Sequence, residues 1–538
     1  MKIRMNLAAR ELMPAITRMW EASGEKLRRM RRRYDAGKGS PVFTVRGKYT
    51  ARGWTEWTLG FYIGSFLLQF DATGEEEMLR VGRREMDGCL DVHVTAAGVH
   101  DHGFMQVSTW GALRRLMKEG RIAADEREVR VCELALKCSG ATQARRWTTL
   151  PNGGYIYSFN GPHSLFVDTL RSLRALGLAH RLGGVLLGEN DRHISLLERL
   201  VQHANTTATY AVFYGKGRDA YDVRGRVAHE SIFNVNDGAY RCPNSQQGYS
   251  PFTTWTRGLA WAMLGFAEQL EFLETCGKEE LRALGGAAEI KKWMTKAARA
   301  VCDYYIEVTP RDGVPYWDTG APGLAKMEGY AERDADPFNE YEPVDSSAAA
   351  IAAQGLLRLG SFLNHARYWQ AGLTVLKRLL EEPYLSCTGR HEGLLLHSVY
   401  HRPNGWDYVP PGRRVPCGEA CDGGGEACVL REAGSDVNGR SAGAVPAGKG
   451  SRNQTRCCAG QIVAAGVCEI KNAEGYGFFL EKFCQCAGNL GTGCLMGSIL
   501  RRNGRRGTTG KRMGGGLLWI CCATGGMCWT MCLEKSRR

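Results

Sequence analysis

Apolar residues recur at three- and four-residue spacing through most of the chain. This spacing is typical of amphipathic helices, in which such positions share one face. Turn-forming sequences such as DATGEE at 71–76, KEGR at 118–121 and TCGK at 275–278 separate the segments. The pattern predicts helices over 8–36, 57–72, 75–87, 103–119, 123–138, 164–182, 191–213, 255–275, 279–307, 345–363 and 365–382.

The predicted helices come mostly as consecutive pairs joined by short loops. One segment, VRGRVAHESIFNVNDGAY at 223–240, has instead the pattern of a small strand or hairpin insertion. Helix pairs with longer loops on one side favour a toroid of helical hairpins. The chain is therefore predicted to be all-α.

The composition agrees with a globular protein of enzyme size. The chain has 538 residues, of which 44% are hydrophobic and 23% charged, as in ordinary domains with a buried core. No apolar run approaches the roughly 20 residues that cross a bilayer, so we expect no membrane partner. The amino-terminal sequence MKIRMNLAARELMPAITRMW lacks the apolar core and cleavage site of a secretory signal. We therefore expect a cytoplasmic protein with reduced cysteines.

The formal charge of +14 is unevenly distributed. Residues 421–538 carry 16 Lys and Arg against 8 Asp and Glu, so this segment accounts for +8. A second basic cluster, KLRRMRRRYDAGKGS at 26–40, has Leu27, Met30 and Tyr34 interleaved at helical spacing. That spacing favours a solvated helix face over a nucleic-acid site, and we expect no nucleic-acid partner. A modest positive field would attract anionic oligosaccharides.

The stretch QGYSPFTTWTRGLAWA, at 247–262, combines an amide, a guanidinium and an indole at the start of an apolar helix. These are the groups with which a protein grips a sugar acid: Gln247 can pair with hydroxyls, Arg257 with a carboxylate, and Trp261 can stack on a sugar ring. Arg257 and Trp261 are four residues apart and share a helix face. The alternative is that the Arg and Trp are structural residues at a helix start.

Two upstream segments carry acids. In VHDHGFMQ, Asp101 stands between two histidines, and in PHSLFVDTLRSLRALGLAHRLG, Asp168 lies in an apolar helical run. Burial raises the pKa of a carboxyl group, which suits it to donate a proton. The structural alternatives are an Asx-type turn for Asp101, and helix capping or an ion pair with Arg171 or Arg174 for Asp168.

Six ordered blocks resemble glycoside hydrolase family 88, the unsaturated glucuronyl hydrolases. They are WTLGF at 57–61, HDHGF at 100–104, FVDT at 166–169, QGYSPFTTWTRGLAWA at 247–262, and the later VPYWDTGAPG and DSSAAAIAAQGLLRL. The resemblance covers about two-thirds of the chain, from about Trp54 to Glu419, and stops abruptly beyond Cys421. It implies an (α/α)6 barrel of six helical hairpins, whose twelfth helix would follow the loop that ends at Glu419.

The segment from Cys421 to Arg538 differs in kind from the rest. It holds 12 of the 20 cysteines and 24 of the 68 glycines, with one proline and no histidine. Its cysteines occur as CC, CQC and CxxxC, which are poor spacings for a metal module. We therefore divide the chain into a barrel domain, 1–420, and a tail, 421–538, that is out-of-frame translation or otherwise unrelated to the fold. The last helix of the barrel would then be missing or replaced.

The resemblance also implies a reaction. Family members act on oligosaccharides left by polysaccharide lyases, whose non-reducing uronate has a C4=C5 double bond. A protonated Asp donates a proton to C4 while water adds at C5, and the resulting hemiketal opens to release the uronate as a keto acid. One carboxyl group acts as acid and then as base, which calls for a raised pKa. No metal or organic cofactor is implied.

The motifs carry site residues onto this chain by the same resemblance. Asp168 corresponds to the catalytic acid, and Asp101 to a second acid that holds substrate hydroxyls and influences the charge of Asp168. His229, in RVAHESIF, stands where relatives have a substrate-binding histidine; its structural alternative is a satisfied loop histidine. Leu259 departs from the Gln that relatives often have, and Asp345 is expected to cap a helix. The implied substrate-binding residues are Trp57, His100, His229, Gln247, Arg257 and Trp261.

Substrate identity stays open at this level. Family members differ over chondroitin, hyaluronan, heparin and bacterial-polysaccharide disaccharides, and the loop RPNGWDYVPPGRR at 402–414 offers Arg413 and Arg414 to a sulfate or carboxylate. One alternative function is an unsaturated rhamnogalacturonyl hydrolase of pectin breakdown. Another is a sugar-binding toroid without turnover, although such a protein would have no need of both Asp101 and Asp168.

Overall fold

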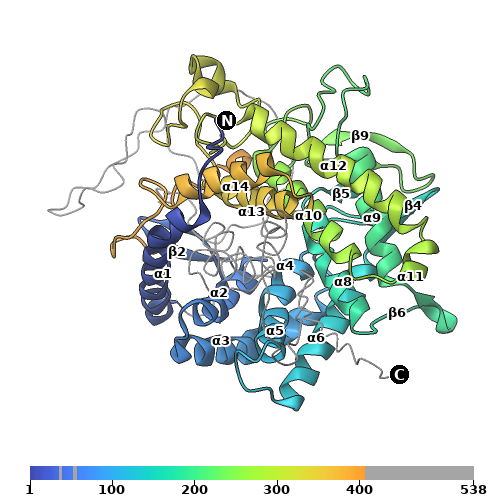
Figure 1. Ribbon diagram of the computed structural model, residues 1–538. Coiled ribbons are helices and arrows are strands. Elements are labelled where there is room, and N and C mark those ends of the chain that lie inside the picture. Colours follow the sequence, from blue (N-terminus) through green and yellow to red (C-terminus); the bar gives the residue numbers. More distant parts are fainter. Residues whose placement is uncertain (35–38, 53–56, 406–538) are drawn as a thin grey trace, which may run out of the picture.

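The helices follow one another around a ring in the computed structural model, which describes residues 1–34, 39–52 and 57–405 (Figure 1). The six outer helices of these residues are α1 (Met13–Arg33), α3 (Glu76–Cys89), α6 (Glu126–Arg145), α9 (Leu196–Tyr210), α12 (Ala287–Val308) and α14 (Ala366–Leu379). The inner helices are α2 (Thr58–Thr73), α4 to α5 (His102–Gln106, Ala112–Lys118), α7 and α8 (Thr169–Ser172, Arg174–Arg181), α10 (Thr256–Leu273) and α13 (Ser346–Phe362).

Inner and outer helices differ in their sequence patterns. Nearly every residue of α2, α10 and α13 is buried, whereas α3, α12 and α14 bury one face. A helix that is apolar all round belongs inside a protein, and an amphipathic one at its surface. Alternation of the two kinds along the chain therefore builds two concentric layers. The predicted (α/α)6 barrel is confirmed.

Glycines allow the inner helices to approach closely where the site is built. A Cβ added at Gly60 of α2 would lie 2.4 Å from the Cα of Met105, and one at Gly103 of α4 would lie 2.2 Å from the carbonyl oxygen of Ser172 in α7. Only glycine fits such contacts. The backbone N–H of Gly103 also donates to the Ser172 hydroxyl at 2.8 Å. The HDHGF segment is thus held against the helix that follows Asp168.

Several predicted helices end or break differently from the expectation. The segment 164–182 begins as strand β5 (Ser164–Phe166) and continues as α7 and α8. The segment 279–307 divides into α11 (Lys278–Arg282) and α12, because Gly285 and Gly286 between them have φ of 102° and 89°. Between α4 and α5 lies η4 (Val107–Gly111), a π-helical turn. Near the amino end, α1 begins only at Met13, after the 3₁₀ turn η1 (Ala9–Leu12).

Short β-sheets lie in the segments that connect the helices of the ring. The predicted insertion at 223–240 contributes β8 (Glu230–Phe233) and leads into β9 (Tyr240–Asn244), and β8 pairs antiparallel with both β5 and β9. Three two-stranded hairpins were not predicted. They are β1 with β2 (Ser40–Val45, Lys48–Arg52), β3 with β4 (Trp147–Leu150, Gly153–Ile156), and β6 with β7 (Leu186–Leu187, His193–Ile194).

The amino-terminal segment is bound to two later parts of the chain. The amino terminus of Met1 donates to the carbonyl of Thr309, after α12, at 3.0 Å. Lys26 of α1 is buried and donates to the carbonyl of Thr388, after α14, at 3.0 Å. The basic cluster on α1 therefore serves partly as an anchor for the fold. The predicted twelfth helix, the boundary at 420, the tail 421–538 and the arginines at 413 and 414 lie outside the described residues.

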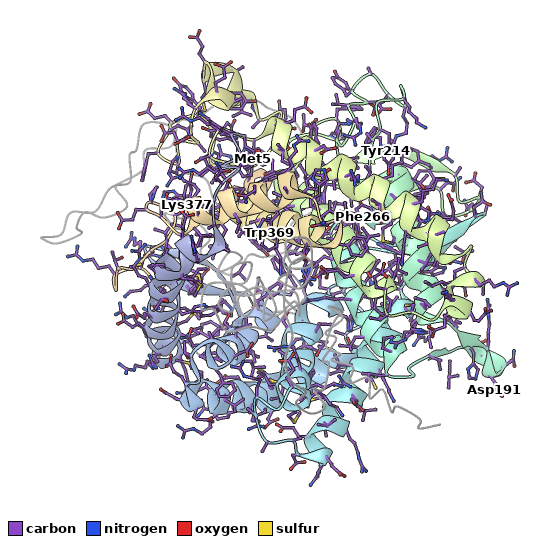
Figure 2. The ribbon with its side chains drawn as sticks, viewed as in Figure 1. Met5, Asp191, Tyr214, Phe266, Trp369 and Lys377 are labelled. Carbon is purple, nitrogen blue, oxygen red and sulfur yellow. The ribbon has the colours of Figure 1, made fainter. Side chains whose placement is uncertain are left out.

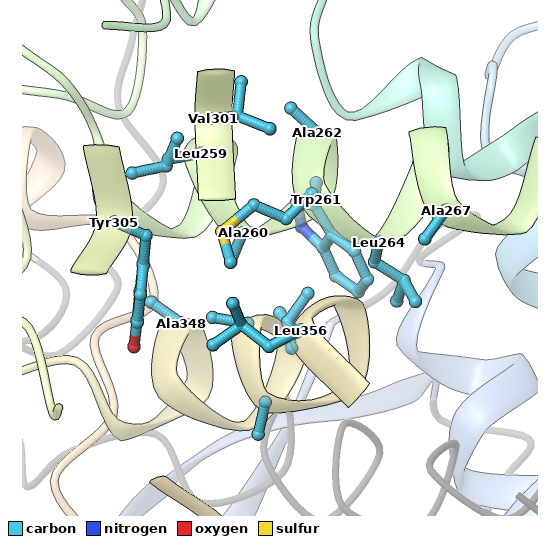
Figure 3. Packing of buried hydrophobic residues seen from close by; sticks show 14 of the residues in the cluster. Leu259, Ala260, Trp261, Ala262, Leu264, Ala267, Val301, Tyr305, Ala348 and Leu356 are labelled. Atoms are coloured by element: carbon cyan, nitrogen blue, oxygen red, sulfur yellow. The ribbon is translucent and has the colours of Figure 1, made fainter. Parts of the chain in front are cut away.

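Aliphatic and aromatic side chains fill the layer between α10, α12 and α13. Leu259, Leu264, Val301 and Tyr305 are completely buried there, beside small alanines that permit close packing (Figure 3). Phe266 of α10 is equally buried, whereas Asp191 stands at the periphery near the β6–β7 hairpin (Figure 2). None of the helices in the described part of the chain has the length and apolarity to cross a bilayer.

Candidate active site

Asp168 is positioned by the junction of a strand and a helix. Strand β5 ends at Phe166, the N–H of Val167 donates to the carbonyl of His229 at 2.9 Å, and α7 begins after Asp168. The β5–β8 pairing therefore places Asp168 and His229 side by side, although they are 61 positions apart in the sequence. Asp168 is the N-cap residue of α7, yet its side chain makes no capping hydrogen bond.

His100 lies between the two predicted acids. Its Nε2 is 3.7 Å from Oδ1 of Asp101 and 3.8 Å from Oδ2 of Asp168. The other carboxylate oxygen of Asp168, Oδ1, is 3.9 Å from Nε2 of His229. These separations are ion-pair contacts rather than direct hydrogen bonds. The four side chains share one buried centre, so the prediction that Asp101 and Asp168 lie at one site is supported by the geometry.

The charges of this centre shift the pKa values in opposite directions. Burial raises the pKa of Asp168, but the adjacent imidazoles of His100 and His229 outweigh burial and lower it. Burial, with the charge of Asp168, raises the pKa of Asp101 against the pull of His100. Burial lowers the pKa of His100, but Asp101 and Asp168 together reverse this and raise it.

These directions correct the expectation of a raised pKa for Asp168. These directions favour the ionised form of Asp168, the neutral form of Asp101 and the protonated form of His100. The reason is that Asp168 faces two imidazoles, which the chain brings from separate elements.

His229 has a defined tautomer. Its Nδ1 accepts the backbone N–H groups of Gln246 at 3.0 Å and of Gln247 at 3.3 Å. An accepting nitrogen carries no proton, so the neutral ring bears its proton on Nε2, the atom that faces Asp168. Burial lowers the pKa of His229 to about 4, which keeps the ring neutral near pH 7. The structural alternative for His229 accounts for Nδ1 alone, because Nε2 has no hydrogen-bond partner among the described residues.

Aromatic rings form a corner beside this centre. Trp57 contacts Trp261 at a centroid distance of 6.5 Å with the ring planes at 85°, and both contact Phe104. Phe104 belongs to the HDHGF segment, so the aromatic corner adjoins His100 and Asp101 along the chain. Trp261 is nearly buried, and Trp57 is half-buried. Perpendicular aromatic faces of this kind are suited to packing against a sugar ring.

The contacts of Arg257 differ from those expected of a substrate-binding residue. Its guanidinium donates to Oδ2 of Asp345 at 3.1 Å, to Oε1 of Gln247 at 2.9 Å, to the carbonyl of Tyr400 at 2.6 Å and to the carbonyl of Val399. These four protein acceptors occupy both terminal nitrogens. The structural alternative therefore describes these donors better than a salt bridge to a substrate carboxylate, and Arg257 orients the half-buried Gln247 amide.

The remaining alternatives are settled by individual contacts. Arg171 pairs with Glu268 at 2.8 Å, and Arg174 donates to the carbonyl of Gly103 at 2.7 Å. No ion pair between either arginine and Asp168 occurs in the described structure. Asp101 also makes no side-chain capping bond. Asp345 caps α13 by accepting from the N–H of Ser347 at 3.0 Å, as predicted.

Three ligand atoms from His100, Asp101 and Asp168 lie within 4.8 Å of one another. This spacing would allow them to share a proton or to surround a cation. The predicted absence of a metal stays a prediction, which chelation can test.

Sequence reasoning missed one residue that contacts this centre and one that its charges affect. Phe159, in the loop after β4, stacks on the His100 ring at a centroid distance of 5.7 Å and is 45% exposed. His203, on α9, is fully buried, and His100 and Asp168 act on its charge. The one signal for His203 was a histidine on the apolar side of a predicted helix, which usually indicates a core position.

No protein-family model matches the chain. An unsaturated glucuronyl hydrolase of Formosa agariphila is 25% identical over 335 residues, which are 61% of this chain and 69% of that protein. The chain is similar in sequence to the unsaturated glucuronyl hydrolases. An unsaturated chondroitin disaccharide hydrolase of Streptococcus agalactiae is 23% identical over 66% of this chain and 78% of that protein.

Solved structures show the same fold. An unsaturated glucuronyl hydrolase specific for heparin aligns with a TM-score of 0.56 and 19% identity, over 72% of this chain and 91% of that one. A complex of a UGL variant with dGlcA-Glc-Rha-Glc aligns with a TM-score of 0.55 and 22% identity, over 73% and 91%. The resemblance to glycoside hydrolase family 88 is thus borne out by the proteins of similar sequence, and the solved structures share the fold.

Proposed function

We propose that this chain is an unsaturated glucuronyl hydrolase, which releases a 4,5-unsaturated uronic acid from the non-reducing end of lyase-generated oligosaccharides. The observation that carries the proposal is the placement of His100 between Asp101 and Asp168, with His229 on the other side of Asp168. Hydration of an enol ether needs one proton and one positioned water. The relatives named above hydrolyse unsaturated uronyl sugars according to their names.

The proton chemistry follows from the charges of the centre. Asp168 faces His100, whose proton it can receive, and then donates that proton to C4 of the substrate as the double bond is broken. Water adds its oxygen to C5, and the Asp168 carboxylate takes the proton that the water loses. The product at C5 is a hemiketal, which opens to the keto acid and frees the remaining sugar. Asp168 then returns this proton to His100, so the centre ends the cycle in its starting state.

Other residues bind or orient the substrate in this proposal. Trp57 and Trp261 present the aromatic corner to the uronate ring, and Asp101 accepts hydrogen bonds from its hydroxyls. Gln247 presents the amide N–H group that remains after Arg257 engages its oxygen. Arg257 therefore positions Gln247, in place of the substrate-binding role implied by the resemblance.

The substrate class is a disaccharide or short oligosaccharide with an unsaturated uronate, such as those from glycosaminoglycans. Chondroitin and heparin occur in the names of two relatives. The retained pair of Asp101 and Asp168 favours turnover over binding alone. An unsaturated rhamnogalacturonyl hydrolase stays the second candidate, because it would use the same hydration. A cytoplasmic location also stays a prediction.

A panel of lyase-generated disaccharides tests the function. The full chain is incubated with chondroitin, hyaluronan, heparin and rhamnogalacturonan products, and loss of the enoate ultraviolet absorbance is followed. We expect loss with at least one glucuronyl substrate. Loss with rhamnogalacturonan products alone would favour the second candidate, and binding without loss for every substrate would favour a sugar-binding protein.

The tail is tested separately. We infer that residues 421–538 arise from out-of-frame translation, because the resemblance to the family ends at their start. Sequencing the source DNA across codons 415–430 decides the matter, since an intact reading frame in independent reads would contradict the inference.

A further inference from the structure

His203 lies on the outer helix α9, within the sequence HANTT. Its side chain is completely buried. Helix α9 packs against strand β4 and against α7, the helix that begins immediately after Asp168. His203 therefore belongs to the layer directly behind the proposed acid, and the proposed mechanism gives it no task.

One ring nitrogen of His203 has a defined partner. The backbone N–H of Ile156, in β4, donates to Nδ1 at 3.0 Å. The ring must then carry its proton on Nε2 when neutral. Burial lowers the pKa of His203 to about 3, so the neutral form prevails near pH 7. His203 and His229 thus have the same tautomer, each fixed by a backbone donor at Nδ1.

The other nitrogen, Nε2, is buried without a hydrogen-bond partner in the described part of the chain. The hydroxyl oxygen of Thr169, the residue after Asp168, is in the same condition. Buried donors are nearly always paired in folded proteins. The hydrogen bond from Ile156 accounts for Nδ1 of His203 but leaves the Nε2 donor unpaired. A purely structural role in the core therefore does not explain why a histidine stands at this position.

The titratable groups that act on His203 are those of the proposed acid centre. They are His100, which precedes α4, and Asp168, which precedes α7. The two residues share a contact of 3.8 Å between Nε2 of His100 and Oδ2 of Asp168. A fixed N–H dipole beside such a pair favours the ionised carboxylate and disfavours positive charge on the imidazole.

We propose that His203 is a positioning residue, a neutral imidazole fixed at Nδ1 by Ile156 whose Nε2–H acts on the His100–Asp168 pair. The inference rests on the proposed function and deepens it. His203 sets the pH above which the pair loses its shared proton. It touches neither substrate nor the reacting atoms, and its effect passes through Asp168 and His100.

Two substitutions separate the roles of the two ring nitrogens. His203→Asn keeps an acceptor near the position of Nδ1 and removes the Nε2 donor. His203→Gln supplies an amide N–H near the position of Nε2 and removes the acceptor for Ile156. Both are made in the full chain, and thermal melting is measured beside kcat/KM as a function of pH.

The positioning role predicts a distinct pattern. His203→Asn should melt within a few degrees of the unsubstituted protein, lose about tenfold in kcat/KM, and move the basic limb of the pH profile upward by roughly 0.5 pH unit or more. His203→Gln should have a lower melting temperature, but its kcat/KM should decline at the same basic pH as that of the unsubstituted protein. A His203→Asn variant with unchanged kcat/KM and an unchanged limb would overturn the proposal.

A measurement without substrate keeps the test independent of the proposed function. Long-range ¹H–¹⁵N spectra of the imidazoles report the tautomer of each ring, and we expect His203 to be protonated at Nε2 alone from about pH 5 to 9. A cation or an Nδ1–H tautomer in that range would overturn the proposal. His100 should titrate at higher pH in His203→Asn than in the unsubstituted protein. If no substrate is turned over, the proposed function fails, and the spectra still decide the role of His203.

Discussion

Replacement of Asp168 by Asn is the sharpest perturbation of the proposed mechanism. The two side chains have nearly the same shape, and the Asp168 side chain makes no capping bond that the fold would lose. An amide can neither deliver the proton to C4 nor take one from water. Acid–base catalysis contributes roughly 10²–10⁴-fold, which is about 2.7–5.5 kcal/mol of barrier. Because one carboxyl group makes both transfers, we expect the upper end.

The variant should also lose some stability at neutral pH. The folded-state pKa of Asp168 is lowered by His100 and His229, so its ionised form stabilises the fold above its unfolded pKa. That contribution disappears as the pH falls through the folded-state pKa. Asp168→Asn should therefore melt slightly lower at pH 7, and the difference should shrink in acid. Circular dichroism gives the melting curve, and initial absorbance loss gives kcat/KM.

Asp312→Asn is a matched control. Asp312 is a buried aspartate away from the site, where its oxygens accept from the N–H of Val314 and Ala335 and from Nε of Arg378, each at 3.2 Å. Loss of a buried acceptor costs about 1–3 kcal/mol, so this variant should melt lower and keep kcat/KM. If Asp168→Asn kept more than about a tenth of the rate, well short of an acid–base contribution, Asp168 would not be the proton donor.

Three further predictions follow from individual contacts. The pKa of His100 is raised, so kcat/KM should decline with pH only above the ordinary histidine pKa of 6.5. A decline near the ordinary pKa of an aspartate would mean that His100 supplies no proton. Arg257→Lys should lower the melting temperature measured without substrate, because an ammonium group cannot replace the hydrogen bonds to Asp345, Gln247 and the two carbonyls. An unchanged melting temperature with a raised KM would instead support the substrate-binding role. Exhaustive chelation should leave kcat unchanged, and a loss reversed by a divalent cation would place a metal at His100, Asp101 and Asp168.

The sequence by itself determined the all-α class and most of the helices. Segments such as 57–72, 255–275 and 345–363 match α2, α10 and α13 closely, because long runs of consistent apolar pattern leave few alternatives. The short hairpins β1–β2 and β3–β4 were not predicted, since a few paired residues carry little periodic signal. The ordered motifs also identified the residues that meet at the site, although they lie far apart in the chain.

Only the tertiary structure decided what those residues do to one another. The sequence QGYSPFTTWTRGLAWA is compatible with a free Arg257 guanidinium. In the structure, however, Arg257 donates hydrogen bonds to the carbonyls of Val399 and Tyr400, which are more than 140 positions away. Apolar neighbours in the sequence suggested a raised pKa for Asp168, but the imidazoles of His100 and His229 lower it. His203 lies behind the acid only because α9 packs on α7. Hydrogen bonds and pKa values depend on distances of a few ångströms across the fold, and local sequence patterns do not contain those distances.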